Sequence, residues 1–219
     1  MKEKKNIVYY WNKFISYIVS HGVSTEELGF NPGTTQNKVS VIEKQLGVQL
    51  PEDYKKLLYM CNGQQPSKYT VIFNWLPTEN RLLSIEEVLE EWKDQQKHND
   101  DLFFNEYNDD DKIRGVFTHK KRIPIADQYS TKSRIYIDYI PGPEGTKCQI
   151  IGLEDIQMVV LSKDLTTLLK KYLILIDKGV MKFRKSDEKW CHSYQLYFPR
   201  GRYFDLDSVS KRLREYFLE

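Results

Sequence analysis

Residues 35–61 constrain the fold most strongly, because two successive helices can be predicted there almost residue by residue. The first helix has apolar residues at the spacing of one buried face, Val39, Ile42 and Leu46. Gly47 follows where a left-handed residue ends a helix, and Pro51 suits the first position of the next one. The second helix has its own buried face, Tyr54, Leu57, Leu58 and Cys61, and we expect Asn62 and Gly63 to end it.

Hydrophobic periodicity predicts further helices over 7–18, from Ser84 to about Lys97, and from Ser162 to Gly179. Alternating or apolar runs predict strands at Val71–Trp75, Ile123–Ala126, Ile135–Ile140, Cys148–Ile151, Gln157–Leu161 and Tyr194–Phe198. Asp205 is expected to cap a last helix. Helices followed by consecutive strands and another helix predict an α+β fold. Its sheet is mostly antiparallel and flanked by helices, with a C-terminal strand–helix extension.

Charge is distributed unevenly along the chain. The net charge is only +2, but residues 86–112 hold eleven acids against three bases, a net charge of −8 that leaves +10 elsewhere. A dedicated nucleic-acid-binding protein is expected to carry a larger positive net charge. Basic and aromatic residues after 181 offer a mixture that can stack on nucleic acid. Because no nucleic-acid-binding module is recognisable, direct nucleic-acid binding is not expected.

Cysteine usage and hydropathy indicate the compartment. Three distant cysteines, Cys61, Cys148 and Cys191, do not form a disulfide framework and favour a reducing environment. The apolar stretch after the N-terminal lysines is interrupted at helical spacing, and no run of about 18 apolar residues occurs elsewhere. We therefore expect a cytoplasmic protein with no membrane partner.

Residues 41–58, VIEKQLGVQLPEDYKKLL, followed by Asn62-Gly63, resemble the opening signature of the SUKH superfamily, the Smi/Knr-like domain. Later pieces follow in the order typical of that family: Ile123–Ala126, Ile135–Asp138 with Gly142 and Gly145 behind it, and Val159–Ser162 before a terminal helix. The resemblance covers about 36–176. It implies three parts: an N-terminal helical segment (1–34) packed on the core, a single SUKH-like domain (35–177) with an acidic insert at about 86–112, and a C-terminal extension (178–219).

The resemblance implies a binding protein without catalytic activity. Bacterial SUKH proteins are associated with immunity against polymorphic toxins, often nucleases, whereas fungal relatives regulate cell-wall assembly and signalling. The first hypothesis is therefore an immunity protein that occludes a cognate toxin. The alternatives are a scaffold or regulator of cell-wall synthesis or signalling, and an enzyme that uses carboxylates.

No residue pattern indicates a cofactor, a metal site or a catalytic centre. The four histidines lack metal-ligand spacing, and GPEGTK at 142–147 is read as a tight turn because it lacks the spacing of a phosphate loop. Carboxylates that could serve an enzyme are Asp127, Asp138, Glu144, Glu154 and Asp155, but no pattern singles out a pair. We therefore expect surface histidines, a structural turn, and carboxylates that form local hydrogen bonds or face a partner.

Partner-binding residues are predicted of two kinds. Loop aromatics supply anchors for pockets on a partner: Trp75, Phe103, Phe104 and Tyr129. Acids pair with a cationic rim: Asp100, Asp101, Asp109, Asp110 and Asp111. Four residues of the family motifs complete the prediction: Asp127, Tyr136, Asp138 and Glu144. Alternatively, the aromatics pack beneath long loops and the acids only solubilise the chain.

Overall fold

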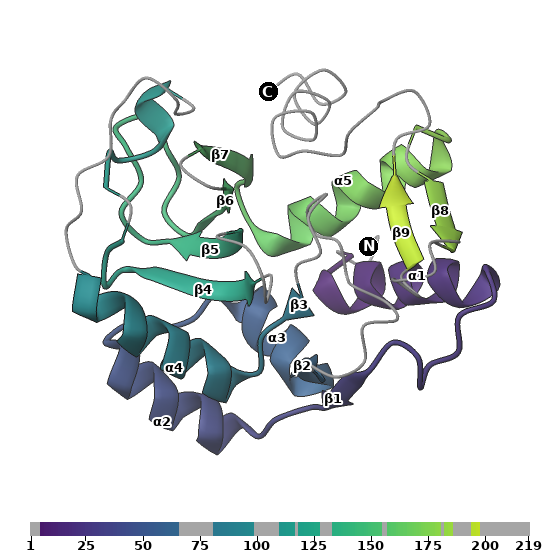
Figure 1. The fold of residues 1–219 in the computed structure, drawn as a ribbon, viewed down its shortest axis with the longest axis horizontal. Coiled ribbons are helices and arrows are strands. Elements are labelled where there is room, and N and C mark those ends of the chain that lie inside the picture. Colours follow the sequence, from purple (N-terminus) through teal and green to yellow (C-terminus); the bar gives the residue numbers. More distant parts are fainter. Residues whose placement is uncertain are drawn as a thin grey trace.

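The computed structural model describes residues 5–65, 81–98, 110–116, 118–127, 133–154, 157–180, 182–185 and 194–197. These ranges contain five α-helices and three antiparallel sheets (Figure 1), which confirms the α+β prediction. No helix in these ranges has the length and apolar character needed to cross a bilayer.

Both helices predicted between residues 35 and 61 are present, as α2 (Gln36–Leu46) and α3 (Glu52–Met60). Gly47 has a φ of 68° and ends α2 as expected. α3 ends at Met60, earlier than expected, because Cys61 is already extended. Cys61, Asn62 and Gly63 lie instead in strand β2 (Cys61–Gln64), which pairs with β1 (Phe30–Pro32). A Cβ at Gly63 would stand 2.2 Å from the Ser84 backbone nitrogen, so only glycine allows this approach.

The other predicted helices within the described residues are present, and some of their capping residues are those predicted from the sequence. α1 covers Ile7–Ser20, and α4 (Ile85–Gln95) begins with the expected Ser84–Glu87 capping box and continues into the 3₁₀ turn η1 (Gln96–His98). α5 covers Leu165–Asp177. Its cap is Asp164 and not Ser162, because Ser162 is still extended at the end of a strand and donates its hydroxyl proton to the Asp164 carbonyl.

The main sheet has five antiparallel strands in the order β3 (Arg81–Leu82), β4 (Arg122–Asp127), β5 (Arg134–Asp138), β6 (Gln149–Glu154) and β7 (Gln157–Ser162). A separate hairpin pairs β8 (Lys182–Lys185) with β9 (Tyr194–Tyr197). The sequence predicts β9 but shows β8 only as a basic stretch. The predicted strand 71–75 and the helix after Asp205 lie outside the described residues.

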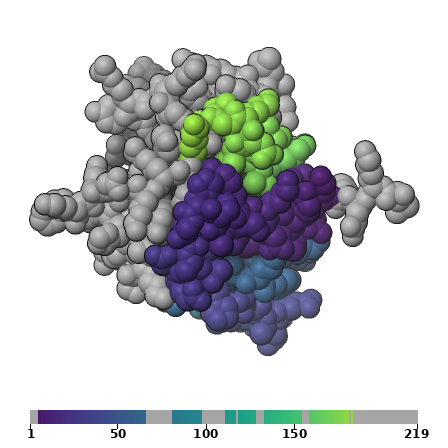
Figure 2. Space-filling model, turned by 90° about the vertical axis from the view of Figure 1, so that its right-hand side faces the viewer, coloured from purple at the N-terminus to yellow at the C-terminus, as the bar shows by residue number. Residues whose placement is uncertain are grey.

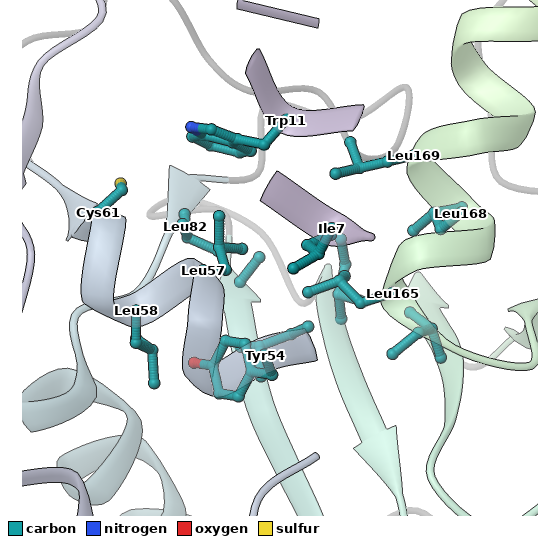
Figure 3. Close-up of a cluster of buried hydrophobic side chains, with 14 of the residues drawn as sticks. Ile7, Trp11, Tyr54, Leu57, Leu58, Cys61, Leu82, Leu165, Leu168 and Leu169 are labelled. Atoms are coloured by element: carbon teal, nitrogen blue, oxygen red, sulfur yellow. The ribbon is translucent and has the colours of Figure 1, made fainter. Parts of the chain in front are cut away.

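The principal core lies where α1, α3 and α5 meet the sheet. Figure 3 shows Ile7 and Trp11 from α1 facing Leu57 of α3 and Leu165 of α5. In the side view of Figure 2, the N-terminal residues lie in the middle. α5 lies above them, and α2 and α3 lie below them. At about 1.5–3 kcal/mol for each fully buried large aliphatic side chain, this cluster is the main stabilising element of the fold.

The opposite face of the main sheet is also covered, which the sequence does not predict. In β5, Ile135 and Ile137 point into the principal core, whereas Tyr136 belongs to a second apolar cluster with Ile113, Ile151, Leu153 and Met158. Ile113 comes from the segment that follows the acidic insert. Because this segment lies over the sheet, both sets of alternating residues in β5 are buried.

Candidate functional site

Two segments distant in sequence meet at the end of the sheet where β5 finishes, at the left in Figure 1. One is residues 110–116, which begins with the 3₁₀ turn η3 (Asp110–Lys112), and the other is residues 139–148, the β5–β6 loop. The Glu144 amide donates to the Asp111 carbonyl (3.0 Å), and the Gly142 amide donates to the Lys112 carbonyl (2.9 Å). The end of the acidic insert is thus joined to the family motif after β5.

Two glycines make this approach possible. A Cβ at Gly142 would lie 2.1 Å from the Asp111 carbonyl oxygen, and one at Gly145 would lie 2.3 Å from the Lys112 carbonyl oxygen. The Gly145 amide also donates to the Gly142 carbonyl (3.0 Å), as expected of the predicted tight turn. Backbone contact of the two segments therefore explains why small residues stand here.

The juxtaposition places two acids together at the surface, and we call Asp111 and Glu144 the acidic corner. Both are exposed, and neither forms an ion pair with another described residue. Lys112, Arg114 and Lys147 are exposed on the same two segments, so the corner carries both signs of charge. The backbone of Asp110 continues the corner toward the acidic insert.

Beneath the acidic corner lies a buried polar group of three side chains, Arg122, Asp138 and Gln149, which we call the latch. Arg122 Nε donates to Asp138 Oδ1 at 3.4 Å, and neither side chain has any exposed surface. The two terminal nitrogens of Arg122 donate to the carbonyls of Val116 and Arg114. Burial lowers the pKa of Arg122, and the neighbouring Asp138 carboxylate opposes that effect.

Asp138 and Gln149 extend the latch to the second segment. Asp138 accepts from the Ile140 amide (3.1 Å) and from Gln149 Nε2 (3.1 Å). Gln149 Nε2 also donates to the Lys112 carbonyl (2.8 Å), while its Oε1 accepts from the Thr146 amide (3.0 Å). Neither Arg122 nor Gln149 is predicted as a site residue from the sequence. The only available signal was that a charged residue opens the apolar strand at 123–126.

The other predicted site residues are dispersed or lie outside the described part. Tyr136 and Asp138 are buried, with 1% and 0% of their surface exposed, because residues 110–116 cover that face of the sheet. As folded, they offer no surface to a partner. Burial also raises the pKa of Tyr136 to about 12. Seven predicted residues lie outside the described ranges: Trp75, Asp100, Asp101, Phe103, Phe104, Asp109 and Tyr129.

Asp127 lies at the opposite end of β4, in a cluster of charged residues beside α4. Arg81 Nη1 donates to Glu87 (2.7 Å), its Nε stands 3.4 Å from Asp127 Oδ1, and Arg134 pairs with Glu91 (3.1 Å). The Nε of Arg81 and the Oδ1 of Asp127 are buried and have no hydrogen-bond partner among the described residues. Asp127 is therefore only partly compensated for its loss of water, and burial raises its pKa despite the nearby Arg81.

This raised pKa predicts a pH dependence of stability. The folded chain binds a proton at Asp127 more tightly than the unfolded chain, whose carboxyl has its ordinary pKa of 3.8. The contribution of Asp127 is therefore most favourable at acid pH and is lost as pH rises through the folded pKa. We compare the free energy of unfolding of the native chain with that of Asp127→Asn. The native value minus the variant value should decrease as pH rises from about 4 to about 7. Urea titrations across this range measure it, and a rising difference would contradict the assignment.

The two described cysteines, Cys61 and Cys148, are not activated as nucleophiles. Burial raises the pKa of the Cys61 thiol to about 12 and also raises that of Cys148, so both are protonated thiols near neutral pH. Within the described ranges, no three His, Cys, Asp or Glu side chains are arranged to hold a metal ion. The exposed carboxylates of the acidic corner can make noncovalent contacts with a cationic surface.

The residues of the predicted family signature stabilise the fold. Glu43 Oε1 accepts from the Leu50 amide (2.7 Å) across the turn between α2 and α3. Asp53 Oδ2 accepts from the Thr166 amide (2.9 Å) in the first turn of α5. Asn62 accepts from the Ile85 amide (2.9 Å) and donates to Glu86 (2.9 Å) at the start of α4. The contacts of these signature residues therefore lie within the architecture and away from the acidic corner.

Comparison with known proteins agrees with this architecture. No curated protein matches the chain. The family model described as SMI1 / KNR4 family (SUKH-1) matches residues 33–171, which is more than half of the chain. The matched region runs from the turn before α2 into α5 and includes the latch and both members of the acidic corner. The chain belongs to the SMI1/KNR4 (SUKH-1) family.

Proposed function

We propose that this chain is a noncatalytic protein-binding module that serves as a bacterial immunity protein and occludes a cognate polymorphic toxin. Membership of the SMI1/KNR4 (SUKH-1) family supports a binding role. The binding surface in this proposal consists of the acidic corner and the acidic insert that leads into it. The insert carries a net charge of −8 between residues 86 and 112.

The observation that carries the proposal is the meeting of Asp111 and Glu144 at one exposed corner. They are 33 positions apart, yet a backbone hydrogen bond of 3.0 Å holds their segments together. Exposed acids held at fixed positions complement a cationic surface and also speed its encounter with the chain. A nuclease has such a surface, because its substrate is a polyanion.

Occlusion is the mechanism that this surface supports. Acids that bind the cationic groove of a nuclease exclude nucleic acid from the same groove by competition. The predicted aromatic anchors, Trp75, Phe103, Phe104 and Tyr129, would then fill pockets beside it and slow dissociation. Of the motif residues, Glu144 retains the partner-contact role in this proposal, whereas Tyr136 and Asp138 support the surface from within.

Co-expression with a toxin tests the proposal directly. We expect the chain to protect cells from the product of a toxin gene adjacent to its own gene, and to form a stable complex with that product. Cell survival and size-exclusion chromatography of the mixed proteins are the measurements. The variant Asp177→Lys is the control, since it reverses an exposed acid at the far end of α5 (Figure 1) and should still protect.

Other outcomes would favour the alternatives. Several weaker partners and no protection from any toxin would indicate a scaffold or regulator. Turnover of a substrate by the purified chain, lost in Asp138→Asn without unfolding, would indicate an enzyme. Either result would contradict the immunity proposal.

A further inference from the structure

The acidic corner has little regular structure of its own. Residues 110–116 and 139–148 contain one 3₁₀ turn and a single isolated bridge between Ile113 and Pro141. Both segments carry exposed charged side chains that gain nothing from burial. Apart from the two backbone hydrogen bonds between them, the contacts that can fix their relative position come from groups beneath them.

We infer that Arg122 is a positioning residue for the acidic corner: through the latch it holds the segments of Asp111 and Glu144 in the arrangement a partner meets. This inference rests on the proposed function, because it concerns the same surface. Arg122 is itself buried and paired with Asp138, so it cannot contact the partner. Its effect has to pass through the backbone groups that it binds.

The hydrogen bonds of the latch reach both segments. Arg122 donates to the carbonyls of Arg114 and Val116, which follow Asp111 in the first segment. Asp138, paired with Arg122, accepts from the Ile140 amide at the start of the second segment. Gln149 then joins the two segments, since it binds the Lys112 carbonyl and the Thr146 amide. Every link is a direct contact within hydrogen-bond distance.

The geometry of the guanidinium explains why arginine stands at this position. A planar group with five N–H donors can bind a carboxylate and two carbonyls at once in fixed directions. Lysine would keep the positive charge beside Asp138, but its single ammonium group cannot reproduce this fork. The variant Arg122→Lys therefore separates the positioning role from the charge.

Hydrogen exchange of backbone amides tests the latch without any partner. The Gly142 and Glu144 amides report on it, because their hydrogen bonds to Lys112 and Asp111 join the two segments. In Arg122→Lys we expect these amides to exchange about tenfold faster or more, with little change in α1 and α5. The matched control is Arg134→Lys, a partly buried arginine on β5 that pairs with Glu91 and should leave both amides unchanged.

A second variant keeps the inference testable if Arg122→Lys does not fold. The double variant Arg122→Met/Asp138→Asn removes the guanidinium without leaving the Asp138 charge buried and unpaired. We expect the same local acceleration at Gly142 and Glu144. Unchanged exchange at both amides in a folded Arg122→Lys, or in the double variant if the former does not fold, would overturn the inference.

Titration with the peptide pentalysine, followed by NMR, separates this inference from the proposed function. In the native chain we expect chemical-shift changes at the amides of Asp111 and Glu144, with affinity reduced about threefold or more in Arg122→Lys. If pentalysine perturbs neither amide of the native chain, the corner does not bind cations and the proposed function fails. Faster exchange in Arg122→Lys would still identify Arg122 as the residue that positions the two segments.

Discussion

Replacing Arg122 with methionine should lower the free energy of unfolding by about 3–5 kcal/mol, as is typical when one partner of a buried ion pair is removed. Methionine fills much of the same volume but donates no hydrogen bond. The Asp138 carboxylate would remain buried without its counter-ion. The carbonyls of Arg114 and Val116 would lose their hydrogen bonds from Arg122, although the Arg114 carbonyl would keep that from the Val116 amide. Chemical denaturation monitored by circular dichroism measures the loss.

A double-mutant cycle shows whether this loss arises from the pair. Arg122→Met, Asp138→Asn and the double variant are compared under the same conditions. We expect the double variant to lose less stability than the two single variants together, because the neutral amide introduced by Asp138→Asn leaves no buried charge without a partner. Additive losses, or a loss below about 1 kcal/mol in Arg122→Met, would show that Arg122 and Asp138 do not act as a pair.

This expectation changes how substitutions of Asp138 should be interpreted. The sequence alone permits a catalytic or partner-facing role for this carboxylate. In the structure it accepts hydrogen bonds from Arg122, Gln149 and the Ile140 amide, and none of its surface is exposed. A loss of function in Asp138→Asn is therefore informative only when the stability of the variant is measured as well.

The elements that the sequence predicts well are those whose signals are local. Gly47 ends α2, the Ser84–Glu87 box begins α4, and strands β4 to β7 of the main sheet fall within a few residues of their predicted ranges, whereas β3 is not predicted. Each signal depends on neighbours within one or two helical turns, or on alternation along one strand. Such patterns do not require knowledge of which segments pair.

The latch and the burial of Tyr136 could not be predicted because they depend on pairing between distant segments. Arg122 meets Asp138 through the register of β4 on β5, and Gln149 meets Asp138 through the register of β6 on β5. A single sequence shows neither register. The alternation in β5 is visible in the sequence. A strand with one solvent-exposed face has the same pattern, so alternation does not reveal that Ile113 and its neighbours cover the second face.

Part of the acidic corner could be predicted as well. The sequence singles out Asp111 by the local density of acids and Glu144 by the family motif, but nothing in either signal indicates that the two meet. The structure brings them together through glycines that allow the backbones to touch. The aromatic anchors lie outside the described residues and remain predictions.

Reversing Asp109, Asp110 and Asp111 to lysine should slow association with the toxin about tenfold or more at low salt. The charge of the approaching surface changes by six units, so long-range attraction becomes repulsion. The thermal midpoint should hardly change, because Asp111 is exposed and pairs with no described cation. A matched pair of single variants, Asp111→Lys and Asp177→Lys, separates the effect of position from that of net charge.

The salt dependence of the association rate tests the central claim, that the chain acts by presenting an acidic surface to a cationic protein. Stopped-flow or surface plasmon resonance measurements between about 0.05 M and 0.5 M salt compare the native chain with the triple lysine variant. We predict that the native rate falls steeply with salt, and that the triple variant starts slower and responds weakly or in the opposite direction. Equal rates and equal salt dependence for the two chains would contradict the account.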